Sequence, residues 1–415
     1  MFETKSRTVP ITKEMVWEAF KKVRSNQGSA GVDKESLEIF QQDLGNNLYK
    51  LWNKMSSGSY FPKPVREVLI PKSDGKKKRK LGIPTVTDRI AQEVIKSYLE
   101  PRLEKEFSDH SYGYRPLKSA HDAIKEVREN IKVYGWVIDM DIKSFFDEVS
   151  HELLMKALDC HVEEKWVKMY IKRWLEIPSQ SADGTLTYKE GQGTPQGGVI
   201  SPLLANLFLH YVLDKWLKIH QPNIAFVRYA DDVIVHCHSE EEAKQLMEKI
   251  SNRLKECNLR LSEEKTKIVY CQNYQRKQRK DYPKKFDFLG FTFKPEMFPS
   301  KKGGMFLGTA CVISQKSQTR ITEGWKSLKF HRGTNMTIQE IAKLINPQMR
   351  GIIQYYGKIN LYSLRSLIRN FHFRLSKWVL NKYKGKSFTE GYKWIESIKK
   401  SYPTLFYHWT LFDHV

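Results

Sequence analysis

Cysteine is scarce in this sequence, and its distribution excludes two common structural frameworks. The 415 residues contain five cysteines, an odd number, and no two of them have C-x-x-C spacing. A disulfide framework and a zinc finger both need paired cysteines, so neither is expected. His236-Cys237-His238 is a cluster of metal-ligand residue types, but on a strand its side chains alternate between opposite faces. We therefore interpret this cluster as structural.

Long apolar runs are also missing. No segment approaches the roughly 20 apolar residues of a membrane-spanning helix, and the first thirty residues lack the apolar core of a signal peptide. We therefore expect a cytoplasmic protein with no membrane partner. A hydrophobic content of 40% excludes a disordered chain, and the length allows two or three domains. The sequence leaves the oligomeric state open.

Acidic residues are fewer than basic ones, and this imbalance indicates which class of molecule the protein binds. The chain has 70 Lys and Arg but only 47 Asp and Glu, for a formal net charge of +23. A protein with so basic a composition is expected to bind a polyanion such as nucleic acid. Residues 303–415 alone carry 18 Lys and Arg against five Asp and Glu, a net charge of +13. We expect this region to be the main contact with the polyanion.

Two adjacent aspartates interrupt an apolar stretch at residues 226–235 (FVRYADDVIV). The residues on either side are typical of strands, so the pattern predicts a hairpin with Asp231 and Asp232 at its tip. Carboxylates held together in this way suit Mg²⁺, a hard cation that prefers oxygen ligands. Because aspartate is also a common turn residue, a solvated hairpin tip without metal is the alternative for this motif taken alone.

A second acidic segment lies upstream, at residues 136–147 (WVIDMDIKSFFD). Asp139 and Asp141 are two residues apart, so on a strand they share one face. An ordinary edge strand with its acids in water is the alternative, but the aromatic pair Phe145-Phe146 favours a packed site. Two acidic strands lying side by side would form a metal site.

Three carboxylates that hold two Mg²⁺ ions, which Mn²⁺ can replace, meet the requirement of nucleotidyl transfer. One ion activates a 3′-hydroxyl group, and the other neutralises the triphosphate and the departing pyrophosphate. Together with the basic composition, the two acidic segments therefore predict a polymerase.

Six sequence blocks occur in a characteristic order. They are residues 107–116 (FSDHSYGYRP), 139–147 (DMDIKSFFD), 193–206 (GTPQGGVISPLLAN), 229–232 (YADD), 261–266 (LSEEKT) and 286–291 (FDFLGF). In this order the blocks resemble those of the reverse transcriptases encoded by group II introns, also called maturases. Residues 193–206 are the most specific of the six, and residues 346–357 (NPQMRGIIQYYG) resemble the thumb signature of the same family.

The resemblance implies an α+β fold of the right-hand polymerase type. Such a fold has fingers, a palm with an antiparallel sheet, and an α-helical thumb. We expect residues 1–60 to be an N-terminal extension and the start of the fingers, and residues 61–300 to be the fingers and palm. Residues 301–385 would then form the helical, maturase-like thumb, and residues 386–415 a C-terminal tail.

The resemblance also implies catalytic, metal-binding roles for Asp141, Asp231 and Asp232. In the family the upstream metal-binding aspartate is followed five residues later by an aromatic residue, which selects Asp141 with Phe146 and leaves Asp139 as the alternative. Phe146 would lie under the incoming sugar and exclude a 2′-hydroxyl group, so the expected product is DNA. Core packing is the alternative role for Phe146.

Four further residues are expected to bind the incoming dNTP. Arg79 lies where the family grips the triphosphate, and a guanidinium group suits bidentate contact with phosphate. Gln196 can hydrogen-bond the nucleotide, and Gly197 lets the backbone approach a ligand closely. Lys265 matches a lysine of the family near the nucleotide site.

Nucleic-acid contacts are expected in two regions. In the first, Lys78 and Lys80 flank Arg79 and can replace it or touch the template backbone. Arg115 is assigned to the template or to the fingers, with a structural salt bridge as the alternative.

The second region is the thumb. Its family signature contains Arg350 and Tyr355, which we assign to nucleic-acid binding. Arg365 and Arg369 lie four residues apart on one face of an expected helix over residues 361–379, where they can follow a phosphate backbone. A solvated helix face is the alternative for this pair.

The expected function is that of an RNA-directed DNA polymerase. It would use dNTPs, an RNA template and a DNA or RNA primer, and would also bind structured group II intron RNA to assist splicing and retromobility. Three alternatives stay open: a splicing maturase without polymerase activity, a free-standing domesticated or defence reverse transcriptase, and a DNA-templated repair polymerase. Because the sequence shows no paired-cysteine, histidine-rich segment of the HNH type, we expect no target cleavage.

Overall fold

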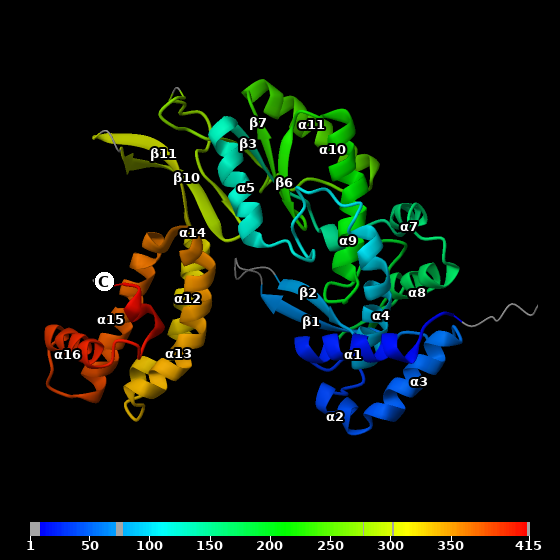
Figure 1. The fold of residues 1–415 in the computed structure, drawn as a ribbon, viewed down its shortest axis with the longest axis horizontal. Helices are drawn as coiled ribbons and strands as arrows, with labels where there is room; N and C mark the ends of the chain where they lie inside the picture. The colour runs from blue at the N-terminus through cyan, green and yellow to red at the C-terminus, as the bar shows by residue number, and fades with distance from the viewer. Residues whose placement is uncertain (1–8, 72–77, 277, 301–302, 413–415) are drawn as a thin grey trace, which may run out of the picture. The chain divides into compact units, whose positions relative to one another are not determined.

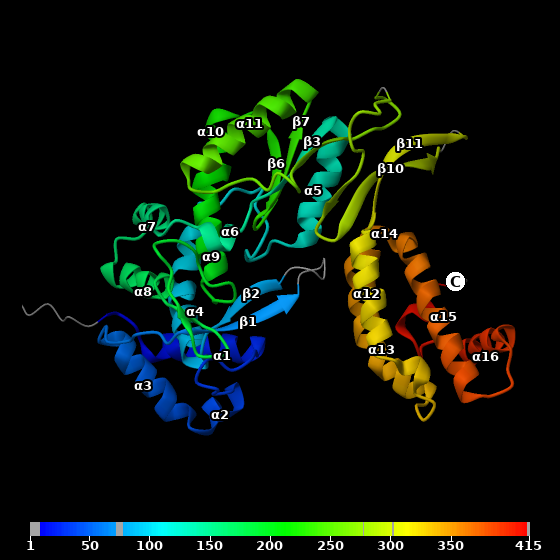
Figure 2. The same ribbon diagram turned by 180° about the vertical axis from the view of Figure 1, so that it is seen from behind.

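The computed structural model describes residues 9–71, 78–276, 278–300 and 303–412. The chain divides into two compact units, an N-terminal unit of residues 1–268 and a C-terminal unit of residues 269–415 (Figures 1 and 2). Within the described ranges, no helix has both the length and the apolar character needed to cross a membrane. All five cysteines are free thiols, and Cys160 is exposed whereas the other four are buried.

Helices and a small sheet form the first part of the N-terminal unit. The helices are α1 (Lys13–Asn26), α2 (Leu37–Gln42), α3 (Leu44–Ser56) and α4 (Val86–Leu103). The sheet has the order β2-β1-β4-β5, and its strands are β1 (Val65–Pro71), β2 (Lys78–Ile83), β4 (Ser179–Gln180) and β5 (Leu186–Thr187). β1 and β2 pair antiparallel. Residues 73–75 (SDG), a sequence typical of a turn, lie outside the described residues.

A four-stranded sheet of order β6-β7-β3-β8 carries the acidic segments. Its strands are β3 (Trp136–Asp141), β6 (Ala225–Tyr229), β7 (Asp232–Cys237) and β8 (Lys267–Tyr270). β3 and β6 both pair antiparallel with β7. Helices α5 (Ala120–Val133) and α11 (Glu240–Glu256) pack against these strands (Figure 1). The two acidic segments are therefore neighbouring strands of one sheet, as the sequence predicts.

The N-terminal unit also contains a cluster of further helices. They are α6 (Phe145–Glu148), α7 (His151–Asp159), α8 (Lys165–Leu175), α9 (Ser201–Leu209), the π-helical turn η1 (His210–Asp214) and α10 (Lys215–His220). α9, η1 and α10 follow one another directly, so residues 201–220 form one helical segment with a π-turn inside it. Such turns are rare and often occur at functional sites. Here the turn ends at the fully buried Asp214.

The C-terminal unit combines one sheet with a group of helices. The sheet has the order β11-β10-β9 and is built from β9 (Phe286–Phe288), β10 (Phe291–Pro299) and β11 (Met305–Ile313). The helices are α12 (Gln315–Ser327), η2 (Phe330–Arg332), α13 (Ile338–Ile352), η3 (Ile353–Gly357), α14 (Lys358–Asn360), η4 (Leu361–Leu364), α15 (Arg365–Lys382), α16 (Phe388–Ser401) and η5 (Tyr407–Thr410). The expected tail at residues 386–415 thus contains α16 and η5, and it buries Ile395, Phe406 and Trp409.

Polar residues at the helix starts explain where several helices begin. α5, α13 and α16 each start with a reciprocal capping box, in which the Ser or Thr at the N-cap and an acid three residues later bond to each other's backbone N–H groups. Replacing such a cap by alanine typically costs about 1 kcal/mol.

Taken together, the elements form a mixed α+β fold with antiparallel sheets and a helical C-terminal region, as predicted at this level of detail.

Candidate active site

A tight turn joins β6 to β7 and carries the two adjacent aspartates. Tyr229 and Asp232 are the last paired residues, so Ala230 and Asp231 form the turn itself. Ala230 has a φ angle of 56°, in the left-handed region that costs an L-residue about 1–2 kcal/mol. The strand-turn-strand arrangement predicted from the sequence is therefore present, and its turn is strained.

The loop before α5 packs directly on this turn. The backbone N–H of Tyr112 donates to the carbonyl of Arg228 (2.8 Å), and the N–H of Arg228 donates to the carbonyl of His110 (2.9 Å). A Cβ atom on Gly113 would lie 2.4 Å from the backbone nitrogen of Ala230. Only glycine allows the loop to approach the turn this closely, which is the physical reason for the glycine in residues 107–116.

A buried polar network supports the turn from inside the protein. The guanidinium of Arg228 donates to both carboxylate oxygens of Asp214 at 2.7 and 2.5 Å, and neither side chain is exposed. It also donates to Oδ1 of Asn206 (3.0 Å) and to the carbonyl of Ala230 (3.1 Å), while Nδ2 of Asn206 donates to the carbonyl of Gly113 (2.7 Å). The network thus connects the π-turn to the strained turn and to the loop that packs on it.

The sheet register brings the carboxylates together. Asp141, the last residue of β3, is the register partner of Asp232, the first residue of β7. Burial raises the pKa of Asp231, and nearby Asp141 raises it further. Although Asp232 can be reached by solvent, desolvation by the surrounding protein raises its pKa to about 7, with further contributions from Asp231, Asp139 and Asp141. These acids destabilise one another's charged forms.

Two lysines offset part of this negative charge. Nζ of Lys265 lies 3.0 and 2.9 Å from the two carboxylate oxygens of Asp141. Nζ of Lys267 lies 3.3 Å from the carboxylate of Asp139. Asp139 lies two residues before Asp141 on β3 and is the register partner of Ile234, whereas Asp141 is the register partner of Asp232.

The donor set suits a divalent metal ion. All the candidate ligands are carboxylates. The raised pKa values of Asp231 and Asp232 reflect burial and a repulsion by neighbouring acids that a cation would relieve. In the part of the chain that the structure describes, no group of three or more His, Cys, Asp or Glu side chains is already arranged to hold a metal ion. The ion pair of Lys265 with Asp141 would therefore have to open for metal to bind.

The residues expected to bind the nucleotide come from separate segments of the N-terminal unit. Arg79 is exposed on β2. Burial raises the pKa of both Asp231 and Tyr114, and the positive charge of Arg79 offsets part of this rise, so Arg79 lies near both side chains. Phe146 is half-buried at the start of α6, with its ring edge-on to Phe145 at a centroid distance of 5.3 Å. Lys265 contacts Asp141 as described above.

The backbone of the glycine-rich block contacts β2. The carbonyl of Gln196 accepts a hydrogen bond from the N–H of Gly82 (2.7 Å). Gly197 has a φ angle of 120°, and a Cβ atom there would lie 2.6 Å from the carbonyl oxygen of Gly82. The close backbone approach predicted for Gly197 is therefore made to β2 of the protein itself. The side chain of Gln196 remains a candidate ligand of the nucleotide.

The structure favours the alternative role for Arg115. This side chain is buried and pairs with Glu104 at 2.7 Å, and it also donates to the backbone carbonyls of Ser108 and Ser111. It therefore holds the loop that packs on the turn, and its assignment to nucleic-acid contact is corrected to a structural salt bridge. Lys78 and Lys80 are exposed on β2, where Lys80 lies 3.4 Å from Glu67.

In the C-terminal unit, the four assigned residues lie in different settings. Arg350 is exposed and lies over the ring of Tyr407. Tyr355 is half-buried, and its hydroxyl donates to the carbonyl of Leu289 (2.9 Å), so it already serves the packing of this unit. Arg365 and Arg369 are exposed on α15, as the helical spacing predicts.

Sequence reasoning left three groups of residues unassigned. The first is the network of Arg228, Asp214 and Asn206. The second is Gln92, a buried side chain whose Oε1 accepts from the N–H groups of Val199 (2.7 Å) and Ile200 at the start of α9. The third is Tyr114, which is 58% exposed beside Tyr229 and therefore accessible to a ligand. A charged residue inside the apolar run of β6 was the available signal for the first group.

Two family models match the chain. Residues 70–293 match the model described as reverse transcriptase (RNA-dependent DNA polymerase), a segment that contains the carboxylates and covers more than half of the chain. The chain therefore belongs to the reverse transcriptase family. Residues 318–395 match the group II intron, maturase-specific domain. Within that family the chain is a member of the group II intron-encoded reverse transcriptases and maturases, as its sequence blocks predict.

Individual relatives agree with this assignment. The group II intron-encoded protein LtrA of Lactococcus lactis subsp. cremoris is 32% identical over 272 residues, which are 65% of this chain and 43% of LtrA. Protein YkfC of Escherichia coli (strain K12) is 34% identical over 296 residues, 62% of this chain and 77% of YkfC. Nuclear intron maturase 2, mitochondrial, of Arabidopsis thaliana is 26% identical over 278 residues, 55% and 37% of the two chains. The chain thus spans less than half the length of LtrA.

Proposed function

We propose that this protein is an RNA-directed DNA polymerase that uses Asp141, Asp231 and Asp232 to hold two Mg²⁺ ions, which Mn²⁺ can replace. The observation that carries the proposal is the register of β3 and β7, which sets Asp141 opposite Asp232 beside the turn that contains Asp231. When bound, the ions would activate the primer 3′-hydroxyl group and neutralise the phosphates.

The surrounding residues would bind and orient the substrates. Arg79, flanked by Lys78 and Lys80, would bind the triphosphate of a dNTP, and Lys265 would be free to contact phosphate once its ion pair with Asp141 opens. Gln196 would contact the nucleotide, and the ring of Phe146 would lie under its sugar. An RNA template and a DNA or RNA primer complete the substrate set.

We propose that these residues belong to a right-hand polymerase fold with fingers, a palm and a thumb. We assign the fingers and palm to residues 61–300, with the start of the fingers in residues 1–60, and the thumb to residues 301–385. Helix α16, within residues 386–415, packs on α15 and would extend the thumb.

Primer extension on an RNA template tests the proposal. The native chain is expected to extend a primer with dNTPs in the presence of Mg²⁺, and Asp231→Asn/Asp232→Asn is expected to lose this activity. The variant keeps the size of both side chains and removes repulsion, so its thermal unfolding temperature should not fall. Equal synthesis by a folded variant would overturn the catalytic assignment.

Sugar selection tests the role of Phe146 separately. Phe146→Ala should increase incorporation of rNTPs relative to dNTPs by roughly tenfold or more, because the ring no longer blocks a 2′-hydroxyl group. Phe145→Ala is the matched control, since Phe145 is buried in the core beside it. An unchanged rNTP preference in Phe146→Ala, with dNTP incorporation retained, would leave Phe146 with a packing role only.

A second function, binding of structured group II intron RNA to assist splicing and retromobility, is favoured by the C-terminal unit. The maturase-specific match lies wholly inside this unit, and the unit is strongly basic. Binding should persist in Asp231→Asn/Asp232→Asn, because the contacts proposed for intron RNA lie in the C-terminal unit. If binding of folded intron RNA is absent in the native chain, the splicing role is rejected while polymerisation stays open.

A further inference from the structure

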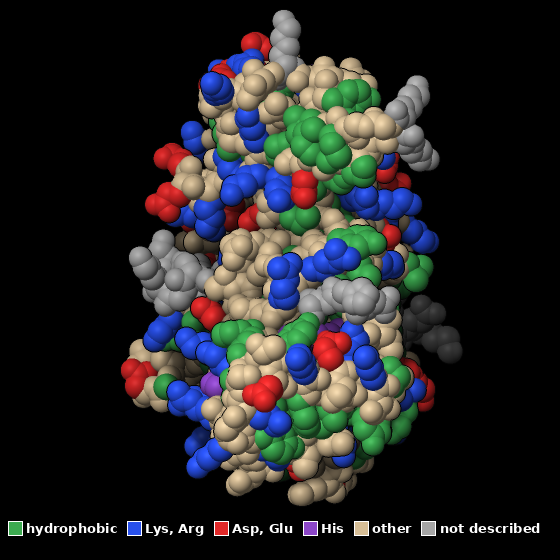
Figure 3. All heavy atoms as spheres, turned by 90° about the vertical axis from the view of Figure 1, so that its left-hand side faces the viewer, with side chains coloured by type: hydrophobic (Ala, Val, Ile, Leu, Met, Phe, Trp, Pro, Cys, Tyr) green, Lys and Arg blue, Asp and Glu red, His purple; other side chains and the backbone are tan. Residues whose placement is uncertain are grey.

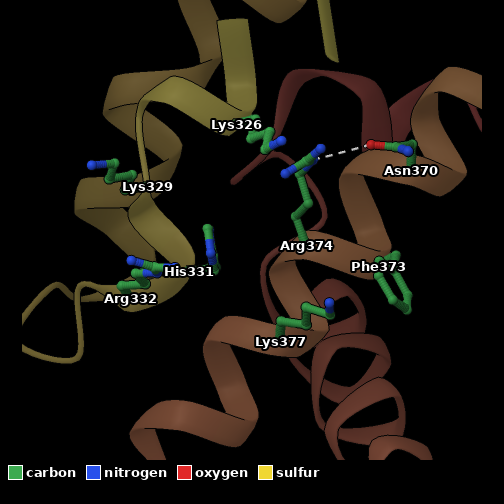
Figure 4. A pocket seen from close by; sticks show the side chains of 8 residues that line it. All are labelled: Lys326, Lys329, His331, Arg332, Asn370, Phe373, Arg374 and Lys377. Carbon is green, nitrogen blue, oxygen red and sulfur yellow. Dashed lines mark hydrogen bonds between the residues drawn. The ribbon is translucent and has the colours of Figure 1, made fainter. Parts of the chain in front are cut away.

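A pocket of about 330 Å³ opens in the C-terminal unit. It is bounded by the end of α12 and by η2 on one side and by α15 on the other (Figure 4). The lining residues are Lys326, Lys329, His331, Arg332, Asn370, Phe373, Arg374 and Lys377. The α15 residues have the spacing i, i+3, i+4 and i+7, so they form one face of that helix. None of these residues was assigned a role from the sequence.

The pocket is lined by cations without compensating acids. Five of its eight residues are Lys or Arg, and no Asp or Glu lines it. Among the residues that the structure describes, no acidic side chain lies within ion-pair distance of these five cations. Arg374 instead donates from Nε to Oδ1 of Asn370 (3.1 Å). Burial and the neighbouring Arg332, Arg374 and Lys377 lower the pKa of His331.

The walls of the pocket are held in place by α15. Three of its side chains donate to backbone carbonyls of the segment 331–336: Trp378 to Gly333 (3.0 Å), Asn381 to His331 (2.7 Å) and Lys382 to Met336 (2.6 Å). The apolar core of Trp325, Phe330 and Phe371 fixes the same elements from below. The cations therefore cannot relieve their repulsion by a large movement of the backbone.

A cluster of like charges on a fixed backbone destabilises the protein that carries it. It is therefore expected to be kept where an anion binds. Arginine forks match the geometry of phosphate, and lysines add charge. The volume exceeds that of a single phosphate ion, and Phe373, 47% exposed, offers an aromatic surface at the rim. Phosphate with an aromatic surface nearby suits a nucleotide of an RNA strand better than an acidic peptide.

We propose that this basic pocket binds phosphate groups of a structured RNA strand. The proposal deepens the second proposed function, on which it rests, because it gives intron RNA a defined contact site. Figure 3 shows Lys and Arg side chains (blue) interspersed with hydrophobic and acidic ones on the displayed face. The C-terminal unit carries 27 Lys and Arg, of which five line the pocket, so an RNA strand would have further cations to contact.

RNA binding by matched lysine variants of the full chain tests the site. Lys326→Gln/Lys377→Gln removes two charges from the pocket, and Lys393→Gln/Lys400→Gln removes two exposed charges from α16 outside it. The pocket variant should weaken binding of a structured group II intron RNA roughly tenfold and reduce the salt-dependence slope by about two, whereas the α16 variant should change both much less. Equal losses in the two variants would overturn the proposal.

Thermal unfolding provides an independent measurement. Without RNA and at low salt, the pocket variant should unfold at a higher temperature than the native chain, because repulsion is removed. Inorganic pyrophosphate, added without Mg²⁺, should stabilise the native chain more than the pocket variant, in which only the proposed active site is left to bind it. If pyrophosphate stabilises the native chain while RNA affinity is unaffected by the pocket variant, the site takes a free phosphate compound and the RNA assignment is overturned.

Two outcomes separate this inference from the proposed function. A native chain that binds intron RNA tightly, together with a pocket variant that binds equally well, would reject the pocket alone. A polyglutamate peptide whose binding is lost in the pocket variant, with RNA binding unchanged, would reassign the pocket to an acidic protein partner. Failure of the native chain to bind any structured RNA would reject both.

Discussion

The two units of this protein handle charge in opposite ways. The N-terminal unit, residues 1–268, carries 43 Lys and Arg against 39 Asp and Glu, a net charge of only +4. The C-terminal unit, residues 269–415, carries 27 against eight, a net charge of +19. The first unit uses its charges in pairs, including a fully buried pair, whereas the second keeps a group of cations together in a pocket. The proposed metal site and the proposed RNA-binding surface thus lie in units with different charge arrangements.

Of the changes that test this comparison, removing a buried charge from the N-terminal unit should have the largest effect on stability. Arg228→Met leaves the carboxylate of Asp214 buried without its partner, which should lower the free energy of unfolding of this unit by about 3–5 kcal/mol. Chemical denaturation checks this value. The double variant Arg228→Met/Asp214→Leu should recover much of the loss, since no charge is left unpaired. Equal losses in the single and double variants would show that the pairing itself matters little.

Disturbing the turn without changing charge should have a smaller effect. Gly113→Ala places a methyl group 2.4 Å from the nitrogen of Ala230, so the turn and Asp231 must shift. Displacement of a catalytic group by about 1 Å can cost on the order of 100-fold in rate. The kcat of primer extension should therefore fall by that order, with the KM for dNTP less affected.

Gly351→Ala in α13 is the matched control for the turn variant. A Cβ atom at Gly351 meets no other atom within 4 Å, and the residue lies inside a helix. This change should leave primer extension intact and stabilise the C-terminal unit by about 0.5–1 kcal/mol. A loss of kcat in Gly113→Ala no larger than in this control would contradict a role for the loop in holding the turn.

A buried histidine in each unit should contribute a loss of stability in acid, and a variant can isolate this contribution. In the N-terminal unit the raised pKa of Asp232 acts in the opposite direction, because the folded state takes up that proton as the pH falls through about 7. Burial lowers the pKa of His236 in the N-terminal unit to about 3, and that of His408 in the C-terminal unit well below its usual value. Below about pH 6.5 the unfolded chain binds protons that these folded imidazoles do not, so stability falls as pH falls. For His236 the loss between pH 7 and pH 5 is about 2 kcal/mol.

His236→Leu should remove this part of the pH dependence from the N-terminal unit only. Urea denaturation at pH 7 and pH 5 measures the change in each unit. His238→Leu, which alters an exposed histidine two residues along the chain, is the control. An unchanged slope in His236→Leu would mean that the buried imidazole is not the source of the acid sensitivity.

Local patterns predicted the parts of the site that follow from periodicity and chain order. The alternation around Asp139 and Asp141, and the two acids in the run at residues 226–235, were sufficient to expect neighbouring strands and a hairpin. Membership of the reverse transcriptase family also followed from the sequence blocks.

Contacts between distant segments were beyond such patterns. The pairing of Arg228 with Asp214, and of Arg115 with Glu104, depends on how helices pack, which no local period encodes. The same is true of the approach of Gly197 to Gly82. The sequence identified residues 193–206 as a characteristic block but did not indicate that this block packs against β2. The basic pocket is assembled from α12, η2 and α15, so its cations looked like ordinary surface charges in the sequence.

The placement of the thiols has a practical consequence for spectroscopy. Cys160, at the end of α7, is the exposed cysteine, and the four others are buried. A maleimide dye applied under native conditions should therefore attach to the N-terminal unit at one position, with no substitution needed. Energy transfer from this dye to a labelled RNA would report directly on the distance between a bound strand and α7, in the unaltered chain.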